Sequence, residues 1–374
     1  MKGDISIKME NPINHFNQIA EPRMERCKLH LLEDIIFLTI AGVLSGADNF
    51  VEVVSFAKTK KEWLLKFLKL ENGIPSHDTI GRLFAAIDSN LFEQCFISWM
   101  QSVVILTEGQ VIAIDGKTLR GSGSATNGKK AIHMVSAFAS ANKVVLGQLA
   151  CAEKSNEITA IPALLELIIV KGCIVTIDAM GCQTAIAKQI IKQGADYILA
   201  VKDNQKKLHK EVQEMFGLVN SKSFETIEKN NGRIETRRCS MLMPTTTGIK
   251  KMNNAEDWEG LKSIVRVEST REINGTKGTE TRYYISSLDT SAEKMNNHVR
   301  EHWCIENKLH WSLDVSFNED ANRTRTDNSA ENLSIIRRVA LNLLKTDATL
   351  KIGIAAKRKT AGWNTNYLES ILNL

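Results

Sequence analysis

The sequence predicts an α/β fold with a helical part in front of it and a β-rich insertion inside it. Apolar residues recur at helical spacing up to about residue 105, and short apolar β-type runs then alternate with helical segments between residues 111 and 201. From about residue 218 to 290, segments of alternating character indicate antiparallel strands. We therefore expect an N-terminal helical domain over residues 1–105 and an α/β domain over residues 106–374.

Within the first part, helical spacing is clearest in two stretches, residues 31–44 and 62–70. Ser76 and Asp78 predict the start of a further helix, because serine is a good N-cap and a carboxylate suits the positive end of the helix dipole. A DNA-reading helix-turn-helix is one interpretation. Ordinary helical packing is the other, and we favour it, because only His77 and Arg82 offer recognition chemistry.

The α/β part has a recognisable element order. The predicted strands and helices, in sequence, are a strand at 111–114, strands at 132–138 and 144–149, a helix at 157–170, a strand at 174–177, a helix at 184–193 and a strand at 197–201. The order β-β-β-α-β-α-β is that of an RNase-H-like fold. The continuous apolar runs indicate parallel strands in the middle of the sheet.

The insertion is predicted to lie between the last core strand and a later helix. Its strand-like segments are residues 224–227, 233–236, 263–268 and 281–285, with Gly- and Asn-containing turns among them. The helical pattern resumes near Ala292 and recurs from about residue 329 to 344. The insertion therefore separates the core strands from the helices that complete the fold.

Composition bounds the class of protein. A chain of 374 residues with 43% hydrophobic and 24% charged residues is typical of a soluble globular protein of about two domains. A net charge of +5 is compatible with a polyanionic partner. Seven scattered cysteines without a C-x-x-C pair, and no signal peptide, indicate a cytoplasmic protein with reduced thiols. The longest apolar run, residues 35–44, is about half of a membrane span, so we expect no membrane segment.

Three acidic residues stand in contexts that suit metal ligands. Asp115 and Asp178 each end an apolar run, and Glu306 lies in a stretch with helical patterning. Each has an ordinary alternative, because an Asp after a strand is often a strand terminator or an N-cap, and a Glu in a helix is usually solvated. The pair of aspartates is more specific, because open α/β sheets bind ligands at strand ends. Carboxylates meeting at one point can hold two Mg²⁺ ions for phosphoryl transfer on nucleic acid.

Five stretches carry a family resemblance. They are residues 113–121, 177–179, 199–205, 232–237 and 302–311, the last continuing to Asp320. Together and in this order they resemble the H-repeat-associated proteins, an insertion-sequence transposase family of the DDE type. The resemblance covers nearly the whole chain.

The resemblance implies an activity and its residues. Asp115 and Asp178 match the first and second catalytic carboxylates of the family, and Glu306 matches the third. It implies Mg²⁺ or Mn²⁺ as cofactor, cleavage and strand transfer at insertion-sequence ends, double-stranded DNA as partner, and at least a homodimer in the active complex. Three positions depart from the family pattern: Asn231 replaces a His, His302 an Arg and Leu313 a Lys.

Basic residues near these stretches are candidate DNA contacts. Lys117 and Arg120 follow the first aspartate in a Gly/Ser-rich segment that could close on phosphate. His302, four residues before Glu306, is a further candidate for DNA contact. The insertion adds candidates for contacts with the ends of the insertion sequence. The candidates in the insertion are Arg233, Arg237 and Arg238.

Other functions remain open at this stage. A catalytically silent or domesticated relative would bind DNA without cutting it, and a nuclease would cut without strand transfer. A zinc site made of His302, Glu306 and His310 is disfavoured, because residues eight apart lie about 12 Å apart along a helix.

Overall fold

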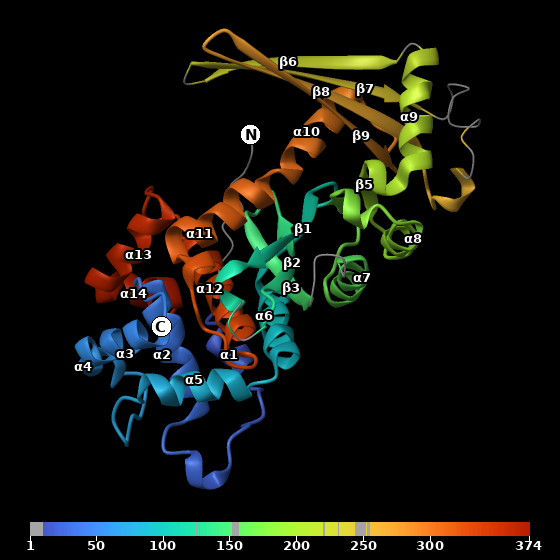
Figure 1. The fold of residues 1–374 in the computed structure, drawn as a ribbon. Helices are drawn as coiled ribbons and strands as arrows, with labels where there is room; N and C mark the ends of the chain where they lie inside the picture. The colour runs from blue at the N-terminus through green and yellow to red at the C-terminus, as the bar shows by residue number, and fades with distance from the viewer. Residues whose placement is uncertain are drawn as a thin grey trace.

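The computed structural model describes residues 10–124, 126, 128–151, 157–219, 221–230, 232–243, 252 and 255–374. Its framework is a nine-stranded mixed sheet in the order β3-β2-β1-β4-β5-β9-β8-β7-β6. Figure 1 shows the sheet running through the molecule, with the N- and C-terminal helices gathered at one end and β6–β9 at the other.

The first five strands form the predicted α/β core. They are β1 (Val111–Leu119), β2 (Ile132–Ala139), β3 (Val144–Cys151), β4 (Ile174–Ile177) and β5 (Asp196–Val201). β1, β2 and β3 form an antiparallel meander, whereas β1, β4 and β5 are parallel. The order 3-2-1-4-5 with this mixture of directions confirms the predicted RNase-H-like core. All four residues of β4, three of them apolar, are buried, as expected of a central parallel strand.

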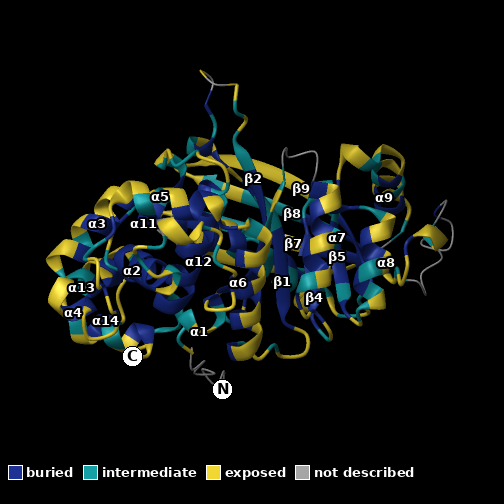
Figure 2. Cartoon of the chain, turned by 90° about the horizontal axis from the view of Figure 1, so that it is seen from below, coloured by how far each residue is buried: buried dark blue, intermediate teal, exposed yellow. Residues whose placement is uncertain are grey.

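The helices of the core cover the sheet where the sequence placed them. α7 (Glu157–Leu167) packs against β2 and β3, and α8 (Thr184–Lys192) packs against β5. Figure 2 shows the middle strands in dark blue beneath exposed yellow helix faces. The core strands are therefore buried while the outer faces of the helices meet solvent.

The insertion extends the same sheet instead of forming a separate one. α9 (Lys206–Leu218) leads into β6 (Lys222–Asn230), β7 (Arg233–Leu242), β8 (Ser263–Ile273) and β9 (Thr276–Ser286). These four strands are antiparallel, and β9 pairs with the core strand β5 between Ile198↔Ser286 and Val201↔Tyr283. The predicted β-rich insertion is therefore continuous with the core.

The N-terminal part is helical, as predicted. Its elements are α1 (Ile13–Phe16), a 3-10 turn η1 (Glu25–Cys27), α2 (Leu32–Leu44), α3 (Phe50–Thr59), α4 (Lys61–Leu64), α5 (His77–Ala86) and α6 (Ser89–Val103). Ser76 is the N-cap of α5, since its side chain accepts a hydrogen bond of 3.1 Å from Thr79 N. The buried side chains Ile80, Leu83 and Phe84 fix α5 against its neighbours, in line with ordinary helical packing.

The C-terminal helices complete the N-terminal ones. α10 (Ala292–His302), a π-helical segment η8 (Ile305–His310), α11 (Trp311–Phe317), α12 (Ser329–Thr346), α13 (Ile354–Trp363) and α14 (Thr365–Leu372) follow the insertion. α12 contacts α2, α5, α6 and β3, and is buried along most of its length. One hydrophobic core therefore joins residues of the N-terminal helices to the sheet. Among the helices in the described ranges, none has the length and apolar character needed to cross a membrane.

Candidate active site

Asp115 and Asp178 lie side by side because of the register between β1 and β4. The last parallel pair is Ile114↔Ile177, and each aspartate is the next residue of its chain. Asp178 follows the end of β4, as expected. Asp115, in contrast, lies inside β1, which continues to Leu119 and pairs Asp115 with Ser136 of β2. The two carboxylates thus meet where β4 ends and β1 continues.

The turn after Asp178 is held from two directions. Asp178 Oδ1 accepts a hydrogen bond of 3.0 Å from Met180 N. Asn204, just beyond β5, donates its side-chain N–H to the carbonyl of Ala179, and Gln205 Nε2 donates to Cys182 O at 2.9 Å. The stretch 199–205 that contributed to the family resemblance thereby fixes the neighbouring strand end.

Glu306 reaches this place from a π-helical turn between α10 and α11. Ile305 and Leu309 are buried in the core, whereas Glu306 is exposed. The segment contacts β1, the strand that carries Asp115. A wide π turn is rare and recurs at functional sites. The sequence predicted an ordinary helix here, and its periodicity contains no signal for the wider turn.

The neighbouring carboxylates affect the pKa of Asp115. Burial raises the pKa of Asp115, and Asp178 adds to the effect. Glu157 and Glu306 raise it further, while the backbone N–H of Gly116 lowers it, and the resulting pKa is about 7. A partly buried carboxyl group near three others favours its neutral form unless a cation is present.

Glu157 is a residue that the sequence reasoning missed. It is the first residue of α7, is buried, and its Oε1 lies 2.6 Å from His133 Nε2. His133 Nδ1 in turn lies 2.9 Å from Thr118 Oγ1. A glutamate at a helix start normally indicates a favourable dipole interaction, so the pattern held no sign of its buried partner.

Two histidines flank the carboxylates. His302 Nδ1 lies 2.9 Å from Thr176 Oγ1, and burial lowers the pKa of His302 to about 4 despite the charge of Asp178. His310 Nδ1 lies 3.7 Å from Asp115 Oδ2, and burial with the help of Arg338 lowers the pKa of His310 to about 3. Both rings are therefore neutral near pH 7. Within the described ranges, no three His, Cys, Asp or Glu side chains already surround a point where an ion could sit.

Lys117 is buried among three acids, of which Glu319 is fully buried and the other two are partly exposed. Its Nζ lies 2.5 Å from Asp314, 3.0 Å from Asp320 and 3.3 Å from Glu319. Burial alone would raise the pKa of Glu319, but Arg338 and Lys117 outweigh it and lower that pKa to about 2. Lys117 thus links β1 to α11 and to the segment that follows α11. Arg120, by contrast, exposes 83% of its side chain, 3.4 Å from Asp320.

A groove of about 600 Å³ connects Glu306 to the insertion. Its cationic lining residues are Arg233, Arg237, Arg271, Arg282, Arg300 and Lys308. Arg282 lies 4.0 Å above the ring of Trp303, which also lines the groove. Arg238 is exposed but does not line this groove, because neighbouring residues of a strand point to opposite faces. The sheet face with Arg233 and Arg237 therefore continues to Glu306.

Comparison with known proteins agrees with this architecture. Residues 13–100 match the family described as DDE_Tnp_1-associated, and residues 106–343 match the family described as Transposase DDE domain. The chain is 44% identical to "Putative transposase YncI" of Escherichia coli over 98% of this chain and 95% of the relative. It is 41% identical to "H repeat-associated putative transposase YhhI" of Escherichia coli over 98% of both chains.

Among solved structures, a piggyBac transposase synaptic complex with hairpin DNA aligns at a TM-score of 0.45 and 12% identity, over 98% of this chain and 77% of that one. A score at this level is too low to add to the fold assignment, which rests on the strand order. The family matches span most of the described helices and strands, and the relatives align along the full chain. This chain belongs to the DDE transposase family, among the H repeat-associated transposase relatives.

Proposed function

We propose that this protein is a DNA transposase that cleaves DNA at the ends of its insertion sequence and joins the freed 3′ ends to target DNA. The catalytic carboxylates in this proposal are Asp115, Asp178 and Glu306. The main support is the β1–β4 register, which places the two aspartates next to each other beyond Ile114 and Ile177. Glu306 also contributes to the raised pKa of Asp115, which supports its inclusion as the third carboxylate.

The donor set fits Mg²⁺ or Mn²⁺. All three proposed ligands are carboxylates, and hard oxygen ligands favour these ions over zinc. Asp115 is partly buried beside other carboxylates, and a bound cation would stabilise its charged form. Two divalent ions there would neutralise the phosphodiester and activate a water or a 3′-hydroxyl for in-line attack.

The protein's own residues prepare this arrangement. Asp115 on the central strand, together with Asp178 and Glu306, would hold the ions. The backbone N–H of Met180 donates to Asp178 Oδ1, which leaves Asp178 Oδ2 to coordinate a metal ion. His302 and His310 are neutral beside the carboxylates, so they add no positive charge that would compete with a cation.

Double-stranded DNA is the proposed partner, both as element end and as target. The groove beside Glu306 supplies guanidinium groups, which bind phosphate oxygens in a bidentate manner. Arg233 and Arg237 in this groove are the predicted insertion contacts that we retain. Arg120, with its exposed side chain, remains a candidate beside Asp115. Joining two ends to one target implies at least a homodimer in the active complex.

The test uses the full chain and a labelled duplex that carries the inverted repeat flanking the gene. Cleavage is measured in Mg²⁺ and in Mn²⁺, and joining is measured with a pre-cleaved end and a plasmid target. Asp115→Asn, Asp178→Asn and Glu306→Gln should each abolish both reactions and leave DNA binding within a few-fold of the parent. Glu301→Gln, on the preceding helix, is the matched control and should remain active.

The results separate the alternatives. Cleavage without joining would indicate a nuclease, and binding without either reaction would indicate a catalytically silent relative. Full cleavage in EDTA would refute the metal mechanism. Activity of Glu306→Gln at the parent level would show that the third carboxylate is misassigned.

A further inference from the structure

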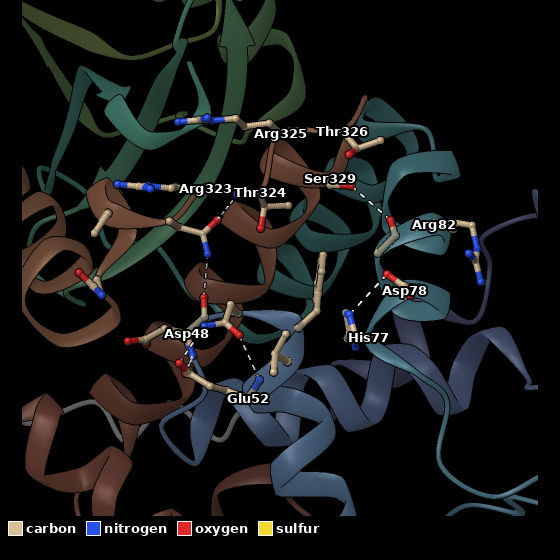
Figure 3. Close-up of a pocket in the computed structure, with 17 residues that line it drawn as sticks. Asp48, Glu52, His77, Asp78, Arg82, Arg323, Thr324, Arg325, Thr326 and Ser329 are labelled. Atoms are coloured by element: carbon tan, nitrogen blue, oxygen red, sulfur yellow. Dashed lines mark hydrogen bonds and ion pairs between the residues drawn. The ribbon is translucent and has the colours of Figure 1, made fainter. Parts of the chain in front are cut away.

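A second groove of about 600 Å³ lies away from the carboxylates, between the N-terminal helices and the segment that follows α11. Figure 3 shows its three walls: the start of α3 with Asp48 and Glu52, the start of α5 with His77 and Arg82, and the segment that carries Arg323 and Arg325. Neither the family resemblance nor the proposed catalytic site assigns a role to this groove.

Hydrogen bonds lock the three walls together. Asn322 Nδ2 donates to Asp48 O at 2.9 Å, and Ser329 Oγ donates to Gly81 O at 3.3 Å. Asn322 Oδ1 also accepts from Thr324 N at 3.0 Å, which fixes the turn that presents the arginines. These hydrogen bonds fix the shape of the groove, whose walls come from segments far apart in the sequence.

Hydrogen bonds also connect the arginine-bearing wall to the turn that follows β1, the strand that carries Asp115. Arg325 Nε donates to Gly121 O at 2.9 Å, and Lys129 donates to the carbonyl of Arg325. A Cβ atom on Gly121 would lie 2.0 Å from Asn322 O, so only glycine permits this approach. The groove thus begins next to the segment that leaves the candidate active site.

Two of the three acids that line the groove accept several hydrogen bonds. Asp48 Oδ1 accepts two hydrogen bonds of 3.1 Å from Arg358. Glu52 accepts from Asp48 N and from Asn49 Nδ2, both at 2.7 Å. Hydrogen bonds hold these two carboxylates on the walls, and Arg358 offsets the charge of Asp48. Asp78, the third acid of the lining, is exposed and lies 3.4 Å from His77 Nε2.

The arginines, in contrast, keep donors free. Arg82 and Arg323 are exposed and make no hydrogen bond or ion pair with the part of the chain that the structure describes. Arg325 uses Nε for Gly121 and has no carboxylate partner among the same residues. Thr324 and Thr326 add hydroxyl groups to the lining. Guanidinium and hydroxyl donors without acceptors are the groups that contact DNA phosphates.

We propose that this groove binds the sugar-phosphate backbone of the DNA that extends from the cleavage site, with Arg82 on one rim and Arg323 and Arg325 on the other. This inference rests on the proposed transposase function and adds a second DNA contact to it, apart from the insertion groove. Contacts with the sugar-phosphate backbone fix the position of the duplex but do not distinguish one base sequence from another. They make binding strongly dependent on salt.

The experiment measures binding of the full chain to a fluorescent duplex by anisotropy, in EDTA and across a salt series. The Arg82→Ala/Arg323→Ala double variant should bind several-fold more weakly, and the slope of log affinity against log salt should fall by about 2. Arg26→Ala, which removes an exposed arginine outside the groove, is the matched control. The Arg82→Lys/Arg323→Lys variant should recover most of the salt slope.

Two failures are distinguishable. If the parent binds no DNA, the proposed function fails. If the parent binds DNA and the double variant matches Arg26→Ala in affinity and slope, the groove is not a DNA contact and this inference alone is wrong. Both arginines lack partners within the described residues, so equal melting temperatures of the variants are expected and exclude unfolding as the cause.

Discussion

Glu157 and His133 form a buried pair, with 2.6 Å between Oε1 and Nε2, directly against the backbone of Gly116. Gly116 immediately follows Asp115, so this pair lies beside the candidate active site. A Cβ atom on Gly116 would lie 2.2 Å from His133 Nε2 and 2.3 Å from Glu157 Oε1. The position of β1, and with it that of Asp115, depends on the absence of that single carbon atom.

Gly116→Ala should therefore abolish or strongly reduce DNA cleavage. The added methyl group must push β1 away from the His133–Glu157 pair or break the pair, and both displace Asp115. An error of about 1 Å in a catalytic group costs about a hundredfold in rate. Cleavage is compared with that of Gly217→Ala, where a Cβ atom meets nothing within 4 Å. Parent-level cleavage by Gly116→Ala would show that the pair can move without consequence.

The sheet was predictable because its signal is local. Apolar runs and their order were enough to identify the five core strands, including the parallel β4 beside β1. The end of β1 was not predictable from its apolar run, since β1 continues past Asp115 by pairing with β2. Strand length here depends on the neighbour and not on the strand's own residues.

The features that the sequence did not reveal depend on tertiary packing. The π turn at Glu306 and the buried Glu157 both depend on contacts with distant segments. The helices before residue 105 share a core with α12, so removing them would expose buried apolar surface. Point substitutions in the grooves are therefore a better test of DNA recognition than deletion of residues 1–105.

Divalent metal should stabilise the protein itself. The carboxylates around Asp115 repel one another, and a cation that binds only the folded state raises its stability by mass action. At a concentration about one hundred times the dissociation constant, the gain is about 2.7 kcal/mol. Melting is followed with and without Mn²⁺, for the parent and for Asp115→Asn. An equal increase in melting temperature for both proteins would mean that the ion binds elsewhere.

Lys117→Met should destabilise the fold more than it weakens DNA binding. Its Nζ is the partner of Glu319, which is fully buried, and of Asp314 and Asp320. Removing one side of a buried ion pair typically costs about 3–5 kcal/mol. Urea unfolding and DNA anisotropy are measured on the same variant. A normal unfolding midpoint with weakened DNA binding would instead support the direct phosphate contact that the sequence predicted for Lys117.

Glu93→Gln should make the protein more stable at neutral and alkaline pH. Burial raises the pKa of Glu93 from 4.5 to about 8, while Gln148 N donates a hydrogen bond of 2.8 Å to its Oε1. Below pH 4.5 the group is protonated in both states. Between pH 4.5 and 8 the unfolded state ionises while the folded state stays neutral, so unfolding becomes easier.

Glutamine keeps the acceptor for Gln148 N and cannot ionise. The stability difference between Glu93→Gln and the parent should therefore grow as pH rises through this window, to no more than about 5 kcal/mol. Denaturant unfolding from pH 4 to 8.5 measures it, with the exposed Glu71→Gln as control. A difference that does not change with pH would show that Glu93 is already ionised in the folded protein.

The two faces of the insertion sheet should differ in their effect on DNA. Arg233 of β7 and Arg271 of β8 line the groove that leads to Glu306, whereas the exposed Arg238 of β7 does not. Arg233→Ala and Arg271→Ala should each weaken binding and lower the salt slope by about 1, because each removes one phosphate contact. Arg238→Ala removes the same charge from the same sheet and is the matched control, so a loss of nonspecific attraction alone would affect all three equally.

Anisotropy with end-containing and unrelated duplexes gives affinity and slope for each variant. If Arg238→Ala weakens binding as much as Arg233→Ala, the DNA does not follow the groove to Glu306, and the opposite face of the insertion must be considered as its path.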